Sequence, residues 1–147
     1  MRVAVALAAL AASTPASAAL GEPAGSVSAD ERSLSAVRLT STARGAFTVE
    51  RLESRAHTVH EYVSPSGVVF AVSWEGVSRP DLSVLLGAYA APYRRALAQS
   101  GPARGRRWRR VETGGAVVET WGHMRALRGR AYVPALLPPG VTLDEIR

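Results

Sequence analysis

Arginine side chains crowd one short segment of the sequence, between residues 104 and 110. A guanidinium group binds phosphate or carboxylate oxygens through two parallel hydrogen bonds, and an indole ring can stack on a ligand or lie at an interface. These residue types at this density predict an anion-binding site. Its candidate residues are Arg104, Arg106, Arg107, Trp108, Arg109 and Arg110.

The arginine segment has a second interpretation, which the sequence leaves open. Runs of charge commonly form solvated loops, and on an edge strand they discourage pairing with other chains. If the segment is a strand, Arg107 and Arg109 lie on one face while Arg106, Trp108 and Arg110 lie on the other. All 18 basic residues are arginine, which is also consistent with GC-rich codon usage.

The segment from His57 to Glu61 carries side chains that bind metals, but its spacing does not suit a metal site. Familiar zinc motifs place their ligands one helical turn apart, whereas this segment is rich in strand-forming residues. On a strand, His57 and His60 point to opposite faces, and His57 and Glu61 lie about 13 Å apart on one face. We therefore expect exposed strand residues here, with no metal and no cofactor.

Catalytic patterns are hard to find elsewhere in the chain. There is no G-x-S-x-G sequence, and turn chemistry explains Ser66, which lies between Pro65 and Gly67. The absence of cysteine excludes disulfides, thiolate metal sites and a cysteine nucleophile. The acidic pair Asp144 and Glu145 lies near an end that we expect to be mobile. Binding is therefore favoured over catalysis, and a hydrolase with a dispersed site stays open.

The first 18 residues have the layout of a secretory signal peptide. Arg2 precedes an apolar stretch over 3–12, then Pro15 interrupts the helix, and small residues follow at the positions that a signal peptidase reads. Cleavage is expected after Ala18. The apolar stretch is shorter than the roughly 20 residues that a membrane span needs, and no later segment is a candidate. The protein is predicted to be periplasmic or secreted.

The remaining chain is expected to form a flexible lead-in over 19–46, with a possible short helix over 30–37, and a single domain over 47–147. Residues 58–63 and 68–74 are rich in strand formers and flank a Pro-Gly turn, which predicts a hairpin. By alternation, one face of the second strand should meet the core. That face carries Val68, Phe70, Val72 and Trp74.

A helix is predicted to start near Asp81, because apolar residues then recur at helical spacing. These residues are Leu82, Leu85, Leu86, Tyr89, Tyr93 and Leu97. Pro92 lies inside this pattern and must kink or split the helix. Short strands around Gly114 and Gly115 complete the order of elements. The predicted fold class is α+β: an antiparallel sheet built on hairpins, with one main amphipathic helix packed against it.

Three stretches resemble the signature of an uncharacterised family of exported proteins, found mainly in proteobacteria, whose domain has no assigned function. They are EYVSPSGVVFAVSW from Glu61, LLGAY from Leu85 and GHMRALRGRAYVPALLP from Gly122. The resemblance covers nearly the whole chain, including the signal. It implies a bacterial, periplasmic protein and assigns no functional residue.

These observations predict a small exported binding or structural module of the cell envelope. The expected partner is an anionic envelope component, such as a phospholipid head group, a lipopolysaccharide phosphate or an acidic glycan, and export argues against nucleic acid. The apolar, proline-rich segment over 136–140 supports an alternative, an assembly or interaction factor that binds an envelope protein.

Overall fold

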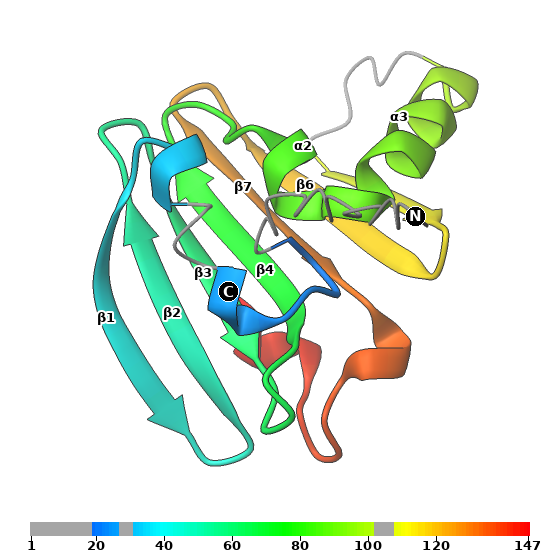
Figure 1. Ribbon diagram of the computed structural model, residues 1–147. Helices are drawn as coiled ribbons and strands as arrows, with labels where there is room; N and C mark the ends of the chain where they lie inside the picture. Colours follow the sequence, from blue (N-terminus) through cyan, green and yellow to red (C-terminus); the bar gives the residue numbers. More distant parts are fainter. Residues whose placement is uncertain (1–18, 27–30, 102–107) are drawn as a thin grey trace, which may run out of the picture.

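The computed structural model describes residues 19–26, 31–101 and 108–147, which fold around one seven-stranded antiparallel sheet (Figure 1). The strand order is β1-β2-β3-β4-β7-β6-β5, which confirms an α+β domain built on hairpins. The strands are β1 (Val37–Arg44), β2 (Phe47–Glu53), β3 (His57–Val63), β4 (Val69–Gly76), β5 (Trp108–Thr113), β6 (Ala116–His123) and β7 (Ala126–Tyr132).

Two hairpins follow directly from turn chemistry. Between β3 and β4, the amide of Gly67 donates to the Ser64 carbonyl at 2.9 Å, as the Pro-Gly turn predicts. Between β5 and β6, Gly114 and Gly115 both have positive φ, at 57° and 87°. Two consecutive positive φ angles match the right-handed twist of a tight hairpin, and glycine adopts them without steric cost.

The helices cover one face of the sheet, which we call the helix face (Figure 1). They are α2 (Leu82–Leu86), the 3₁₀ turn η2 (Gly87–Tyr89) and α3 (Ala90–Gln99), and Asp81 caps α2 by accepting from the Ser83 amide at 2.8 Å. The helix is split as predicted, but the break lies at Gly87, whose φ is 49°. Pro92 falls in the first turn of α3, where a proline is tolerated.

The segment 19–46 differs from the flexible lead-in that we expected. Ala19 and Leu20 are buried, and the Leu20 amide donates to the Leu85 carbonyl at 2.9 Å. A 3₁₀ turn, η1 (Ala24–Ser26), follows, and in place of the helix expected over 30–37 only residues 31–33 are helical among those described. Strand β1 was not predicted, because all its residues are exposed and no alternation of apolar and polar residues marks it.

The core has two parts, one on each face of the sheet. Val72 and Trp74 pack under the helices, as predicted, but Phe70 packs on the opposite face. The cause is a β-bulge: Val63 pairs with Val69, and Tyr62 pairs with Ala71. The extra residue in β4 shifts the alternation, so the prediction that Phe70 shares a face with Val72 and Trp74 is wrong.

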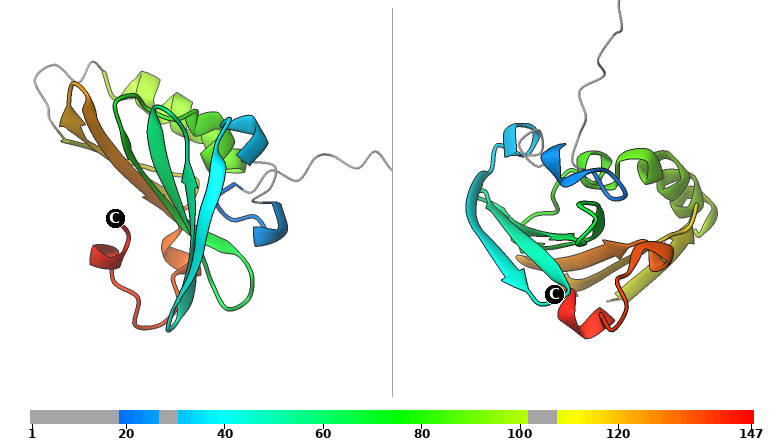
Figure 2. Two further views of the ribbon diagram at one scale, coloured as in Figure 1. Left: turned by 90° about the vertical axis from the view of Figure 1, so that its left-hand side faces the viewer. Right: turned by 60° about the horizontal axis from the view of Figure 1, so that its bottom comes forward.

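The last residues pack on the sheet face opposite the helices, which we call the tail face (Figure 2). The 3₁₀ turns η3 (Pro134–Leu136) and η4 (Leu143–Glu145) lead to Ile146, which is 1 % exposed. The Arg147 amide donates to the Tyr62 hydroxyl at 2.9 Å, and that hydroxyl donates to the Arg147 carbonyl at 2.7 Å. The expectation of a mobile end around Asp144 is therefore wrong.

Within the described part of the chain, the helices are too short or too polar for any of them to span a bilayer.

Candidate functional site

The arginine segment enters the sheet at its C-terminal part. Arg104, Arg106 and Arg107 lie outside the described residues, while Trp108, Arg109 and Arg110 begin β5. Arg109 lies on the helix face, where its guanidinium donates to the Gly101 carbonyl at 2.8 Å. Trp108 and Arg110 lie on the tail face, so the alternation predicted for a strand is confirmed for these three residues.

A cavity of about 480 Å³ opens on the tail face beside Trp108. Strands β4 to β7 form its floor, and the C-terminal segment, residues 142–147, forms one wall. A volume of this size is typical of sites for small ligands. The aromatic, charged and aliphatic side chains that line the cavity are Glu75, Trp108, Glu119, Trp121, Arg128, Arg130, Ile146 and Arg147.

A pair of tryptophans forms the apolar part of the cavity. Trp108 on β5 and Trp121 on β6 lie directly opposite each other in the register of these antiparallel strands. Directly opposed residues share a face and have neighbouring Cβ atoms. Trp108 is 54 % exposed, a large value for an indole side chain. The two rings therefore offer an accessible aromatic surface to a ligand.

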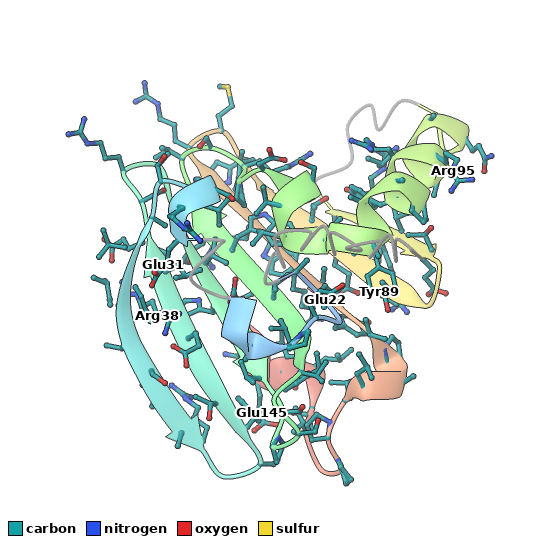
Figure 3. All side chains as sticks on the ribbon, viewed as in Figure 1. Glu22, Glu31, Arg38, Tyr89, Arg95 and Glu145 are labelled. Carbon is teal, nitrogen blue, oxygen red and sulfur yellow. The ribbon has the colours of Figure 1, made fainter. Side chains whose placement is uncertain are left out.

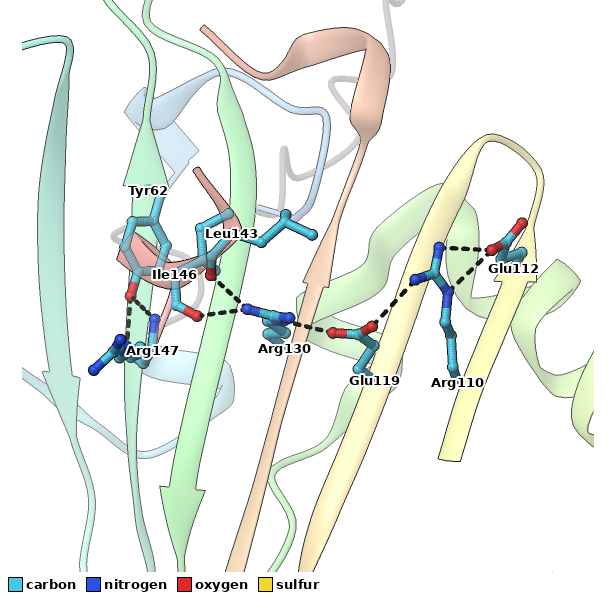
Figure 4. Close-up of polar contacts among 8 residues, drawn as sticks. All are labelled: Tyr62, Arg110, Glu112, Glu119, Arg130, Leu143, Ile146 and Arg147. Carbon is cyan, nitrogen blue, oxygen red and sulfur yellow. Dashed lines mark hydrogen bonds and ion pairs between the residues drawn. The ribbon is translucent and has the colours of Figure 1, made fainter. Parts of the chain in front are cut away.

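A chain of ion pairs crosses the tail face and holds the cavity walls in place (Figure 4). Glu119 accepts a hydrogen bond from Arg130 at 2.6 Å and pairs with Arg110 at 3.5 Å. Arg110 also pairs with Glu112 at 2.7 Å, and the Glu112 carboxylate raises the pKa of the Arg110 guanidinium. Each oxygen of the buried Glu119 carboxylate is therefore paired with a guanidinium group.

Arg130 connects this network to the C-terminal segment. Its guanidinium donates to the backbone carbonyls of Leu143 and Ile146 (Figure 4). The same group lies 5.8 Å from the ring centroid of Trp121 and 5.9 Å from that of Tyr132. Arg130 therefore joins Glu119, Trp121 and the C-terminal segment, and it acts as a structural centre of the site.

The charged groups left for a ligand are Arg128, Glu75 and Arg147. Arg128 pairs with Glu75 at 3.4 Å, and their side chains are 60 % and 54 % exposed. Arg147 is exposed at the rim, beside the backbone bonds that fix its main chain to Tyr62. Exposed pairs of this kind are held weakly, so each partner can exchange its contact for a ligand.

A second cavity, of about 380 Å³, lies beyond this pair at the end of the sheet. It is bordered by the loop between β2 and β3 and by the turn between β6 and β7. Arg55 and Arg125 contribute positive charge to it, and Glu53 contributes negative charge. Glu75 and Arg128 line both cavities, so the two spaces meet at this ion pair.

The histidine segment lies on β3, as predicted, but the expectation that its residues are exposed is wrong. Glu61 is fully buried, and His57 and His60 are partly buried because strands lie on both sides of β3. Burial lowers the pKa of both imidazoles below its ordinary value. In the described ranges, no three side chains of the metal-binding types come together as a ligand set.

Most residues of the cavity were missed by the sequence analysis. Glu119, Trp121, Arg128 and Arg130 belong to strands β6 and β7, outside the arginine segment. They meet Trp108 and Arg110 only through the strand register. The two-residue turn that joins β6 to β7 consists of Met124 and Arg125, so none of the usual turn residues marked it in the sequence.

These features define the class of protein: an α+β domain whose sheet is covered by helices on one face and has a ligand-sized cavity on the other. The chain belongs to the family described as protein of unknown function (DUF2844), whose family model matches residues 16–146. The resemblance to an uncharacterised family is thus confirmed. No curated protein and no solved structure matches the chain.

Proposed function

We propose that this protein is an exported module that binds an anionic component of the bacterial cell envelope in the tail-face cavity. The observation that carries the proposal is the arrangement of the accessible tryptophan pair beside Arg128, in a cavity that Arg147 also borders. An arginine fork recognises carboxylate and phosphate oxygens, and indole rings supply contact area at small entropic cost.

The support for an envelope ligand comes from the sequence. The layout of residues 1–18 is that of a secretory signal, and the net charge of +6, which becomes +5 when Arg2 leaves with the signal, attracts anionic surfaces. The support for binding over catalysis comes from Glu119. Because Arg110 and Arg130 occupy both of its oxygens, this buried carboxylate is not free to act as a general acid or base.

Co-sedimentation with bacterial envelope fractions tests this proposal. We expect the purified protein to sediment with the fractions at low salt and to be released as salt rises, because screening shortens the range of charge interactions from about 10 Å at 0.1 M to about 3 Å at 1 M. Arg128→Gln should weaken binding about tenfold, the typical effect of losing a hydrogen bond to a charged group.

The matched control is Arg95→Gln. Arg95 projects from α3, on the opposite side of the sheet from the cavity (Figure 3). This substitution removes the same charge, so it separates the cavity from general electrostatic attraction. Equal binding by the parent, Arg128→Gln and Arg95→Gln proteins would contradict the proposal, as would the absence of binding to any fraction.

A further inference from the structure

We infer that the ligand is an extended acidic polysaccharide, which runs from the tryptophan pair across Arg128 into the second cavity. The inference rests on the proposed function and names its ligand. It follows from three properties of the site: the length of the path, the flat aromatic surface at one end, and the near balance of its charges.

The path is long because four side chains stand in one row across the sheet. Trp108 pairs with Trp121, Trp121 pairs with Arg128, and Arg128 pairs with Glu75. Neighbouring strands lie about 4.8 Å apart, so a row over four strands spans about 14 Å. The second cavity begins at Glu75 and Arg128 and extends the path to the turn that contains Arg125. A single small anion would leave most of this path empty.

The tryptophan end suits the face of a sugar ring. A pyranose presents its C–H groups on its faces and its hydroxyls around its edge, so an indole ring can cover one face while polar groups bind the edge. Glu75 can accept hydrogen bonds from hydroxyls, and Arg128 can donate to hydroxyls or carboxylates. A hydroxyl-rich chain thus uses both the aromatic and the charged side chains of the row.

The charges of the site favour widely spaced carboxylates over phosphate clusters. The larger cavity contains three arginines and two glutamates, and Glu119 already neutralises Arg130. A dense polyanion would bring its charges against Glu75 and Glu119, and like charges repel at this range. The second cavity repeats the pattern, because Arg55 and Arg125 are accompanied by Glu53. In both cavities the arginines only slightly outnumber the glutamates. A glycan that carries one carboxylate per sugar ring matches this small and widely spaced excess of positive charge.

A length series of defined oligosaccharides tests the inference. The probes are oligogalacturonates of one to six units, and uncharged cello-oligosaccharides of the same lengths serve as controls. Calorimetry gives the affinity, and indole fluorescence reports the contact with Trp108 and Trp121. We expect the affinity for the acidic series to rise at least tenfold from monomer to hexamer, and each uncharged oligomer to bind at least tenfold more weakly.

Substitutions in exposed side chains separate the two ends of the path. Trp108→Ala should weaken both series about 3- to 10-fold, because it removes an aromatic stacking partner. Arg128→Gln should bring the acidic series close to the uncharged one, and Arg95→Gln should leave both unchanged. Far-ultraviolet circular dichroism of each variant verifies the fold before binding is compared.

Three outcomes would overturn the inference: a monomer that binds as tightly as a hexamer, an uncharged series as tight as the acidic one, or binding to phosphatidylglycerol vesicles without binding to either series. The sedimentation experiment keeps this failure distinct from that of the proposed function. Envelope binding that survives while the acidic series fails would leave the proposed function standing and remove the polysaccharide.

Discussion

Arg130 illustrates how one side chain organises the tail face at the residue scale. It pairs with Glu119 at 2.6 Å, lies beside the rings of Trp121 and Tyr132, and donates to two backbone carbonyls of the C-terminal segment. A planar guanidinium has five donors and two aromatic-compatible faces, which a lysine ammonium lacks. Arg130 therefore belongs to the scaffold of the site, and recognition is left to Arg128 and the tryptophan pair.

The histidines of β3 make the stability of the protein depend on pH. Burial lowers the pKa of His60, the cations Arg51 and Arg44 lower it further, and only Glu75 opposes them. Above the ordinary value of 6.5, His60 is neutral in both the folded and the unfolded states, so it does not contribute to the pH dependence. Below pH 6.5 the unfolded chain takes up a proton before the folded state does. The free energy of unfolding therefore decreases as the pH is lowered, until the folded state is protonated as well.

We predict that His60→Gln reduces the slope of the free energy of unfolding against pH as the pH falls below 6.5, the ordinary pKa from which burial lowers the folded-state value. His57, whose pKa burial also lowers, should add to this effect in the His57→Gln, His60→Gln double variant. Urea unfolding at a series of pH values measures the slope. A double variant with the slope of the parent protein would show that neither imidazole contributes.

Residue positions were predictable from sequence only where alternation applies to a single strand. Alternation placed Trp108 and Arg110 on one face and Arg109 on the other, and β5 confirms it. It could not show that Glu61 is fully buried, because burial depends on the strands and the layers that cover β3. The pairing of Glu119 with Arg130 likewise depends on register, which no local pattern reveals.

At the scale of elements, the C-terminal segment behaves as part of the fold. The Thr142 amide donates to the Glu145 carboxylate at 2.8 Å, which closes a capping box on η4. This turn presents Ile146 to the core on the tail face, together with Phe47, Tyr62 and Phe70. The segment therefore covers apolar side chains of the tail face that the sheet alone would leave exposed to solvent.

We predict that Ile146→Ala lowers the free energy of unfolding by about 2–5 kcal/mol, the usual effect of truncating a fully buried isoleucine. Urea unfolding measures the change. Leu136→Ala is the control, because Leu136 lies in the same C-terminal region and is 37 % exposed, so its truncation should cost much less. Equal losses in the two variants would mean that Ile146 is not packed as described.

Elements with a clear period were predictable, and elements defined by their surroundings were not. The helix is marked by its apolar spacing, and the β3–β4 hairpin is marked by its turn residues. Both patterns can be recognised without knowing which elements lie next to them. Strand β1 is polar and exposed throughout, so only its pairing with β2 identifies it. The bulge at Phe70 is also a property of the strand pair, because it depends on how β3 and β4 are aligned.

At the scale of the whole molecule, the first described residues, Ala19 and Leu20, pack against the rest of the fold. They are each 1 % exposed, and the Gly21 amide donates to the Val69 carbonyl at 2.8 Å. The contact with the helix break is close: a Cβ atom on Gly87 would lie 2.3 Å from the Ala19 Cβ atom. Ala19 thus occupies the space that the glycine leaves, and a chain that began after Leu20 would lose these contacts.

Cleavage after Ala18, expected from the sequence, stays a prediction. We predict that the mature protein begins at Ala19, because cleavage after Ala18 retains every buried contact described for Ala19 and Leu20. Mass spectrometry of the protein from the periplasm or medium measures the N-terminus. Ala18→Asp should block processing and leave the longer precursor, because the peptidase reads a small residue at this position. Ser17→Asp, at the tolerant position beside it, should still be processed. An intact chain that starts at Met1 in the cytosol would contradict the prediction and would make nucleic acid the leading anionic partner.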